Sequence, residues 1–257
     1  MKSALRESVR PFTLTALTVA IFWVMMGTAR IYADQREYPR FAAAESSRMI
    51  TPPAQGETIE GVCDFIKRKI DQVQTMKCEV ELSKWRERKP RRVSTGPLEL
   101  EREKGAYVRL TRKDETSEYI VNAVMIWDYD LKDKKAQYIP TIMPIIGFFV
   151  KEAMALNILL SLDKDTLKLR GSVEVEGEPC WMVEGKTPRR LEVVGLFPAP
   201  VKVFVSKRDG IIRRVLIPDK SKTIILLRKI SINQPVDASR FQFKPPPDVK
   251  TVNILGF

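Results

Sequence analysis

Residues 58–83, TIEGVCDFIKRKIDQVQTMKCEVELS, contain both periodicities from which the fold can be inferred. From Ile59 to Val73, apolar side chains recur every three or four residues, which predicts an amphipathic helix of four to five turns that begins at Thr58. From Met76 to Ser83 the period becomes two, and apolar residues alternate with Lys and Glu, as in a half-buried strand. A helix followed directly by a strand with one apolar face is therefore expected.

Short alternating segments recur along the rest of the chain and are separated by turn signals. Asp209-Gly210 lies between two apolar runs and indicates a hairpin whose two turn residues both need positive φ. In the longest segment, 118–130, one face is predicted to hold Tyr119, Val121, Ala123, Met125, Trp127 and Tyr129. The remaining predicted strands are 97–103, 106–112, 134–139, 167–175, 180–185, the runs on either side of Asp209-Gly210, 222–233 and 241–243.

The resulting count is about eleven antiparallel strands and two helices. Two helices cannot cover a parallel α/β sheet, so that class is excluded. The pattern predicts a mainly β (α+β) fold, a half-open antiparallel barrel with the N-terminal helix and a second helix against it, and a two-sheet sandwich is the alternative. The second helix is predicted over 145–162, which is apolar around its circumference. It is either buried against the sheet or a lid over an apolar cavity.

The N-terminus has the layout of an export signal, because Lys2, Arg6 and Arg10 precede an uncharged apolar segment, 11–29. With cleavage after Ala33, residues 1–33 form the signal, 34–56 a flexible linker and 57–257 a single domain. Segment 11–29 is also close to the length that spans a bilayer, so it can instead stay as an inner-membrane anchor. In both cases the domain is expected in the periplasm.

The composition excludes several kinds of chemistry. The chain has no histidine, which removes Ser-His and Cys-His nucleophiles and the commonest metal ligand. Cys63, Cys78 and Cys180 lack metal-ligand spacing, and buried free thiols are favoured over a Cys63–Cys78 disulfide. Asp128 and Asp130 are interpreted as part of a solvated face. No catalytic pair, metal site or cofactor is predicted, and an exported hydrolase would need an acidic pair that faces a cavity.

The formal net charge is +12, which favours anionic partners such as lipid head groups or an acidic protein, or simply reflects a solvated surface. The basic runs 67–69 and 86–92 lack the interleaved aromatic residues of single-strand nucleic-acid grooves. No nucleic-acid partner is therefore expected.

Three further segments are similar to parts of one known family. Residues 104–110 (KGAYVRL) resemble its basic-Pro segment, with Gly105 in place of proline, and 122–130 (NAVMIWDYD) resemble its turn and Trp-x-Tyr strand. Residues 241–249 (FQFKPPPDV) resemble its terminal Phe-x-Phe-x-Pro-Pro signature. Together with the export signal, the helix and the long strand, they resemble the LolA family of periplasmic lipoprotein carriers over about residues 58–252.

The resemblance implies an unclosed barrel with a helical lid, whose cavity shelters the acyl chains of lipoproteins or lipids. It also implies an arginine that tethers the lid through helix carbonyls, and Arg109 is the candidate. The expected cavity lining is Val80, Leu82, Met125, Trp127, Phe148, Phe149, Val201 and Val203.

The expected function is a non-catalytic carrier that delivers acyl chains towards the outer membrane, with membrane-bound donor and acceptor proteins as partners. The alternative is a membrane-tethered sensor or regulator on the same fold.

Overall fold

The computed structural model describes residues 50–86, 89–102, 104–122, 124–140, 159, 162–186, 200–217 and 223–253. Its helix α2 spans Ile59–Ile70. The strands are β1 (Thr75–Arg86), β2 (Lys89–Glu101), β3 (Gly105–Arg112), β4 (Glu115–Asn122), β5 (Met125–Asp130), β6 (Lys135–Pro140), β7 (Lys168–Val175), β8 (Glu178–Lys186), β9 (Pro200–Ser206), β10 (Ile212–Ile217), β11 (Thr223–Ile232) and β12 (Lys250–Asn253). The predicted signal and most of the predicted 145–162 helix lie outside the described residues.

Helix α2 begins where the sequence predicts. The Thr58 hydroxyl accepts a hydrogen bond from the Gly61 amide at 3.1 Å, which satisfies one of the free N–H groups of the first turn. Val62, Ile66 and Ile70 are buried on one side. The helix ends at Ile70, earlier than predicted, and Val73 is buried in the connection to β1.

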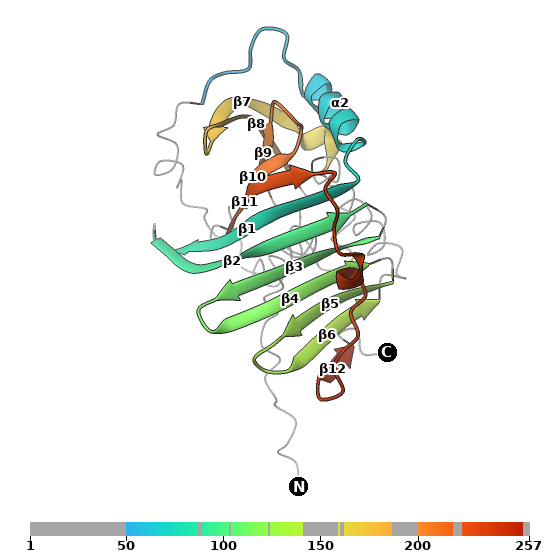
Figure 1. Ribbon diagram of the computed structural model, residues 1–257. Coiled ribbons are helices and arrows are strands. Elements are labelled where there is room, and N and C mark those ends of the chain that lie inside the picture. The colour runs from blue at the N-terminus through green and yellow to red at the C-terminus, as the bar shows by residue number, and fades with distance from the viewer. Residues whose placement is uncertain are drawn as a thin grey trace.

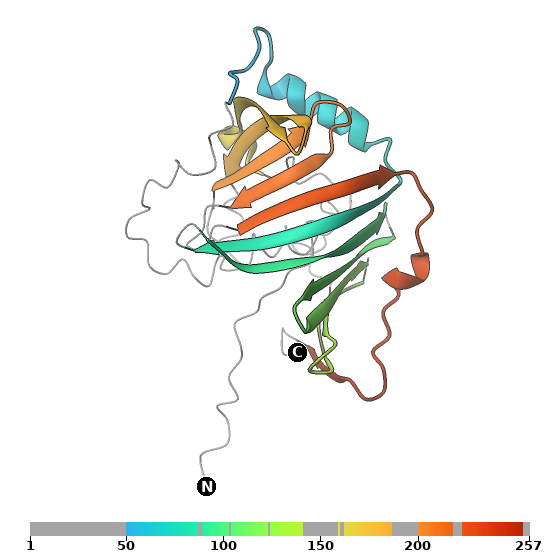
Figure 2. The same ribbon diagram turned by 60° about the vertical axis from the view of Figure 1, so that its left-hand side comes forward.

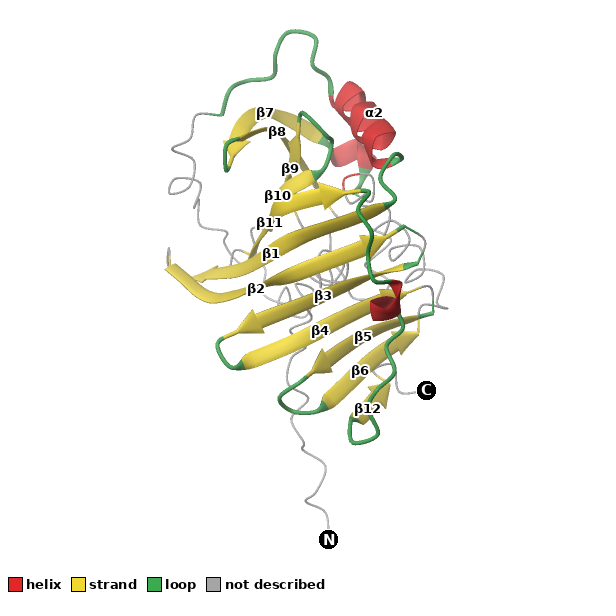
Figure 3. Cartoon of the chain, viewed as in Figure 1, coloured by secondary structure: helices red, strands yellow, loops and turns green. Residues whose placement is uncertain are grey.

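All twelve strands form a single sheet, in the order β12-β6-β5-β4-β3-β2-β1-β11-β10-β9-β8-β7 (Figure 1). Neighbouring strands are antiparallel, except that β12 runs parallel to β6. The sheet twists and bends, and its edge strands β7 and β12 lie at opposite ends, so it does not close (Figures 2 and 3). The half-open, largely antiparallel fold is confirmed, and one sheet excludes the sandwich.

The predicted 118–130 strand is two strands, because the chain turns at Asn122. The Asn122 side-chain oxygen accepts hydrogen bonds from the amides of Val124 and Met125, at 2.9 and 2.8 Å. β4 and β5 therefore run antiparallel, and Val121 pairs with Ile126. The predicted common face for Tyr119 through Tyr129 is wrong, because the turn reverses which residues of the second half share the face of Val121.

Other differences are local. β2 begins at Lys89 rather than at residue 97, and residues 241–243 are no strand, since a 3-10 helix covers Ala238–Phe241. The hairpin between β9 and β10 forms as predicted, although Gly210, at φ +72°, is the member of the Asp209-Gly210 pair with positive φ. Thr51, placed in the predicted linker, exchanges two backbone hydrogen bonds with Ser172 of β7.

The main core lies on the inner face of the sheet, defined here as the face that meets α2. We call this core the inner cluster. Its strand residues include Met76, Val80, Leu82, Leu98, Leu100, Val108, Tyr119, Val121, Ile126, Val183, Val201, Val203, Val215, Ile225 and Leu227. Because successive side chains of a strand alternate between faces, each strand offers every second residue to this cluster.

The outer face near β3–β6 carries a second cluster under residues 233–249, which we call the strap. The strap runs from β11 across the sheet to β12 (Figures 1 and 2). Its Phe241 and Phe243 pack with Tyr107, Ile120 and Trp127, and we call this group the strap cluster. A Cβ at Gly105 would lie 2.9 Å from the Phe241 Cβ and 2.5 Å from the Val121 carbonyl oxygen, so glycine there permits the close approach.

The outer face near β7–β11 carries a third group, the hairpin cluster, formed by Val175, Cys180, Met182 and Phe204. The tip of the β7–β8 hairpin is a two-residue turn, with Glu176 and Gly177 at φ 50° and 85°. Its Glu176 carboxylate accepts a hydrogen bond from Arg228 of β11, at 2.7 Å, and Arg228 also donates to Glu81 of β1, at 2.6 Å. The hairpin tip therefore lies over the outer face.

Candidate functional site

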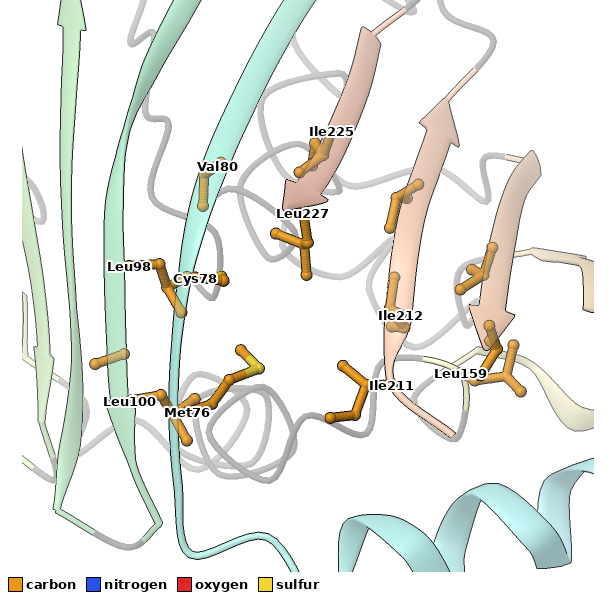
Figure 4. Packing of buried hydrophobic residues seen from close by; sticks show 14 of the residues in the cluster. Met76, Cys78, Val80, Leu98, Leu100, Leu159, Ile211, Ile212, Ile225 and Leu227 are labelled. Atoms are coloured by element: carbon orange, nitrogen blue, oxygen red, sulfur yellow. The ribbon is translucent and has the colours of Figure 1, made fainter. Parts of the chain in front are cut away.

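The inner face is the candidate site because it is the most extensive apolar surface that the described strands form together. Side chains of β1, β2, β10 and β11 point into one space next to α2 (Figure 4). Val80, Leu82 and Leu227 are 2%, 5% and 5% exposed. The surface offers dispersion contacts and exclusion of water, with little directional chemistry.

At the α2 end of this face, Trp181 is held in place by a charged pair. The Phe65 ring of α2 meets the Trp181 ring edge-on, with centroids 5.2 Å apart. The Trp181 indole N–H and the Lys207 ammonium both donate to Glu57, at 3.0 and 2.9 Å. The hydrogen bonds from Lys207 and then Trp181 lower the pKa of Glu57 to about 2. Glu57 therefore stays ionised and fixes the indole against the inner cluster.

Arg102, which follows β2, binds the C-terminal end of α2. Its Nε donates to the Val73 carbonyl at 2.8 Å, and Nη2 donates to the Ile70 carbonyl. Nη1 lies 3.8 Å from the Asp71 carboxylate. A cation at a helix C-terminus satisfies free carbonyls and opposes the negative end of the helix dipole. Arg102 was not predicted from the sequence, because nothing local in the sequence relates it to residues 70–73.

Arg109, the predicted lid tether, lies elsewhere. Its side chain is 48% exposed and its Nε is 3.9 Å from the Glu118 carboxylate. Within the described part of the chain, Arg102 rather than Arg109 donates to a helix carbonyl, that of Ile70 at the end of α2. The segment that Arg109 was predicted to hold, 145–162, falls largely outside that part, so its assignment stays a prediction.

The predicted lining residues divide between the two faces. Val80, Leu82, Val201 and Val203 all belong to the inner cluster. Met125 is half-buried at the start of β5. Trp127 is on the outer face, where its ring lies 5.2 Å from that of Phe243 in the strap cluster. Phe148 and Phe149 lie outside the described residues.

A polar patch follows Ile126 on the inner face. Asp128 and Asp130 alternate with the outward-facing Trp127 and Tyr129, so both carboxylates lie on the side of Ile126. Both are half-buried, and the solvated face predicted for them is wrong. Burial, and then the neighbouring Asp130, raise the pKa of Asp128 to about 7.

One carboxylate of this acidic pair takes part in a turn. The Asp130 carboxylate already accepts hydrogen bonds from the amides of Lys132 and Asp133, at 2.9 and 3.0 Å, and so fixes the β5–β6 turn. Asp130 therefore has a structural role in the β5–β6 turn, whereas Asp128 takes no part in that turn.

The three cysteines are free thiols, as favoured from the sequence. Cys78 belongs to the inner cluster and Cys180 to the hairpin cluster, so the sheet separates them. Burial raises the pKa of the Cys78 thiol and that of the Cys180 thiol to about 12. Protonated thiols in apolar surroundings behave as packing groups.

Three further features of the described residues concern what they could bind: metal-binding groups, membrane-spanning helices and a surface pocket. In the described residues, no group of three or more His, Cys, Asp or Glu side chains is placed to hold a metal ion, and no helix is long and apolar enough to cross a membrane. A pocket of about 290 Å³ opens on the outer face between Glu79, Glu81, Thr95, Pro97 and Arg228. Arg228 is engaged there by Glu81, and Glu79 by Lys229.

Comparison with known proteins yields likeness in structure alone. No family model matches the chain. No curated protein matches it either. An uncharacterized conserved protein from Thermus thermophilus aligns with a TM-score of 0.50 and 12% identity, over 77% of this chain and 99% of that one. At this identity, the alignment supports the fold and nothing finer.

Two other solved structures are more distant. The lipoprotein LppX from Mycobacterium tuberculosis aligns at a TM-score of 0.41 and 13% identity, over 70% of this chain and 100% of that one. A LolA superfamily protein from Nitrosomonas europaea aligns at 0.39 and 7%, over 72% and 98%. The chain is thus structurally similar to these proteins at low identity, and their TM-scores add no argument about function.

Proposed function

We propose that this protein is an exported, non-catalytic carrier that shelters acyl chains of lipids or lipoproteins against its inner face. The observation that carries the proposal is the asymmetry of the sheet. Each outer cluster is small and has its own cover, the strap or the hairpin tip. The inner cluster extends from β1 through β6 and from β8 through β11.

Such a surface suits a ligand whose affinity comes from the apolar area that it buries. Burying one methylene group contributes about 0.8 kcal/mol, so a few acyl chains bind strongly without a specific polar partner. Val80, Leu82, Val201 and Val203 are proposed to contact the chains. These side chains are buried, so entry requires the cover of the inner face to move, and segment 145–162 is proposed as that lid.

Two native tryptophans allow a direct test, because Trp181 belongs to the inner cluster and Trp127 packs in the strap cluster. Variants that keep one of the two, with the other tryptophans changed to Phe, would be mixed with a fatty acid brominated in mid-chain. Bromine quenches indole fluorescence on near contact. We expect quenching of Trp181 and unchanged emission from Trp127, with bound acyl chain in a native mass spectrum.

The opposite pattern would count against the proposal. Quenching of Trp127 alone would place the ligand on the outer face. Quenching of neither, with no acyl adduct in the mass spectrum, would leave the inner face as an ordinary core. Far-UV circular dichroism of both variants controls for folding.

The location is part of the proposal. A diffusible carrier requires cleavage after Ala33, with donor and acceptor proteins at the two membranes. If 11–29 is retained, the same domain is tethered at the inner membrane and acts there as a sensor or in local transfer. N-terminal sequencing of protein from the host envelope distinguishes the two, because a chain that begins at Asp34 has lost the anchor.

A further inference from the structure

The inner face becomes partly polar at β5, where Asp128 follows Ile126. Register pairs Asp128 with Tyr119 of β4 and with Gln137 of β6. Tyr119 is 3% exposed in the inner cluster, and Ile126, two residues before Asp128, is 2% exposed. The Asp128 carboxylate is therefore placed at the margin of the apolar surface to which we assign acyl chains.

Few charges compensate Asp128. Within the described chain, no hydrogen bond or ion pair reaches its carboxylate. On the same face, β5 itself supplies Asp130, β4 supplies the Tyr119 phenol and the Ser117 hydroxyl, and β6 supplies Gln137 and Lys135. Lys250 of β12 lies beside Lys135 and is exposed. Lys135 favours the ionised form of Asp128, and it acts against the stronger effects of burial and of Asp130.

Together these groups place the pKa of Asp128 near neutral pH. Its pKa is raised to about 7, whereas Asp130 shares its charge with two backbone amides. Below that pH Asp128 is neutral, and the margin of the inner face carries one charge fewer. Above it, an acyl chain laid against β5 would have to remove water from a carboxylate, which is costly.

We infer that Asp128 makes the binding of acyl chains to the inner face depend on pH, with binding favoured when its carboxyl group is neutral. This inference rests on the proposed carrier function. If the protein binds acyl chains only when Asp128 is neutral, the apparent dissociation constant equals the intrinsic one divided by the fraction of protein with neutral Asp128. Between pH 6 and pH 8 the affinity should then fall about tenfold.

An uncharged ligand isolates the effect, since a fatty acid would itself titrate. The probe is a monoacylglycerol with a fluorescent acyl chain, titrated with the full mature protein from pH 5.5 to 8.5. The wild type should bind about ten times more weakly at pH 8 than at pH 6. The Asp128→Asn variant should bind with the wild-type pH 6 affinity at every pH.

Asp130→Asn is the matched control, because it removes a charge from the same face and keeps Asp128. It should retain the pH dependence, with its midpoint moved to lower pH. A general change in surface charge would instead affect both variants alike. If Asp128→Asn does not fold by circular dichroism, Asp128→Ser replaces it.

The outcomes separate this inference from the proposed function. Binding that is tight and flat with pH in the wild type overturns the role of Asp128 and leaves the carrier intact. The same slope in Asp128→Asn as in the wild type also overturns it. Absence of binding at every pH, in the wild type and in both variants, overturns the carrier and the inference together.

Discussion

The strap cluster and the hairpin cluster hide apolar groups on the same outer face by different means. The strap covers Tyr107, Ile120 and Trp127 with a segment that belongs to no strand, and its Phe241 and Phe243 pack against them. The hairpin cluster is covered by the sheet itself, whose β7–β8 tip bends back until its Glu176 accepts a hydrogen bond from Arg228. One aromatic substitution should therefore detach the strap from the sheet, whereas the bent sheet should keep the hairpin cluster covered when its surface ion pairs are lost.

The largest effect is expected for Phe241→Ala, which removes the most buried side chain of the strap. Truncating a buried Phe costs about 3–5 kcal/mol in the free energy of unfolding. Urea denaturation measures the loss, and Trp127 emission should shift to the red in the folded state because its cover is gone.

Met182→Ala, in the hairpin cluster, is the matched control. It should also destabilise, by about 2–4 kcal/mol, and leave folded-state Trp127 emission unchanged. Equal emission changes in the two variants would show that the two covers are not independent.

Arg102→Ala is next in magnitude, because Arg102 joins two distant parts of the sheet. It follows β2, the neighbour of the β3 strand under the strap, and it binds α2, which packs on Trp181 of β8. Loss of hydrogen bonds from a charged donor to the Ile70 and Val73 carbonyls should cost about 2 kcal/mol. Hydrogen exchange should then be faster at the last turn of α2. Arg112→Ala, which loses only the exposed pair with Glu115, should cost under about 1 kcal/mol and leave that exchange unchanged.

Glu57→Gln tests the contact that fixes Trp181 of β8. The folded-state pKa of Glu57 is about 2 against an ordinary 4.5, so its ionised form stabilises the fold above pH 4.5. That contribution disappears as the pH falls from 4.5 through 2. At pH 6 the variant should be less stable than the wild type by about 1 kcal/mol, and the gap should close towards pH 2. A gap that stays constant between pH 6 and pH 2 would contradict the assignment.

The smallest effect is expected for Arg228→Ala. Its side chain is 39% exposed, and exposed ion pairs contribute about 0.2–1 kcal/mol. The difference from the wild type should shrink in 1 M salt, as measured by thermal denaturation in low and high salt. A loss above about 2 kcal/mol would mean that the ion pairs, rather than the bend of the sheet, hold the hairpin tip.

The class of fold could be predicted because the period of two is a local property of each strand. The face predicted for Trp127 was wrong, because the apolar alternation passes through residues 118–130 without a glycine or proline to mark the turn at Asn122. Asn can hold a turn through its side chain, and that was the available signal.

Other contacts have no local signal at all. Arg102 reaches a carbonyl 32 residues away, and the Asn122 side-chain amide donates to the Phe241 carbonyl 119 residues away. Whether Asp128 was solvated or faced the core followed from the same turn, so its unusual position could not be derived from the i, i+2 spacing of two acids.

The pairing of β1 with β11 also sets an order of assembly. Glu81 and Arg228, on these neighbouring strands, are 147 residues apart in the chain. The β1–β6 meander and the β7–β8 hairpin each join strands that are close in sequence, and such pairings form early because their loops are short. The central seam closes only when residues 223–232 arrive, and the strap follows it. A chain that emerges N-terminus first therefore holds two unfinished half-sheets, with β1 and β10 as open edges, until residues 223–232 are available. A holding chaperone would be needed most during that interval.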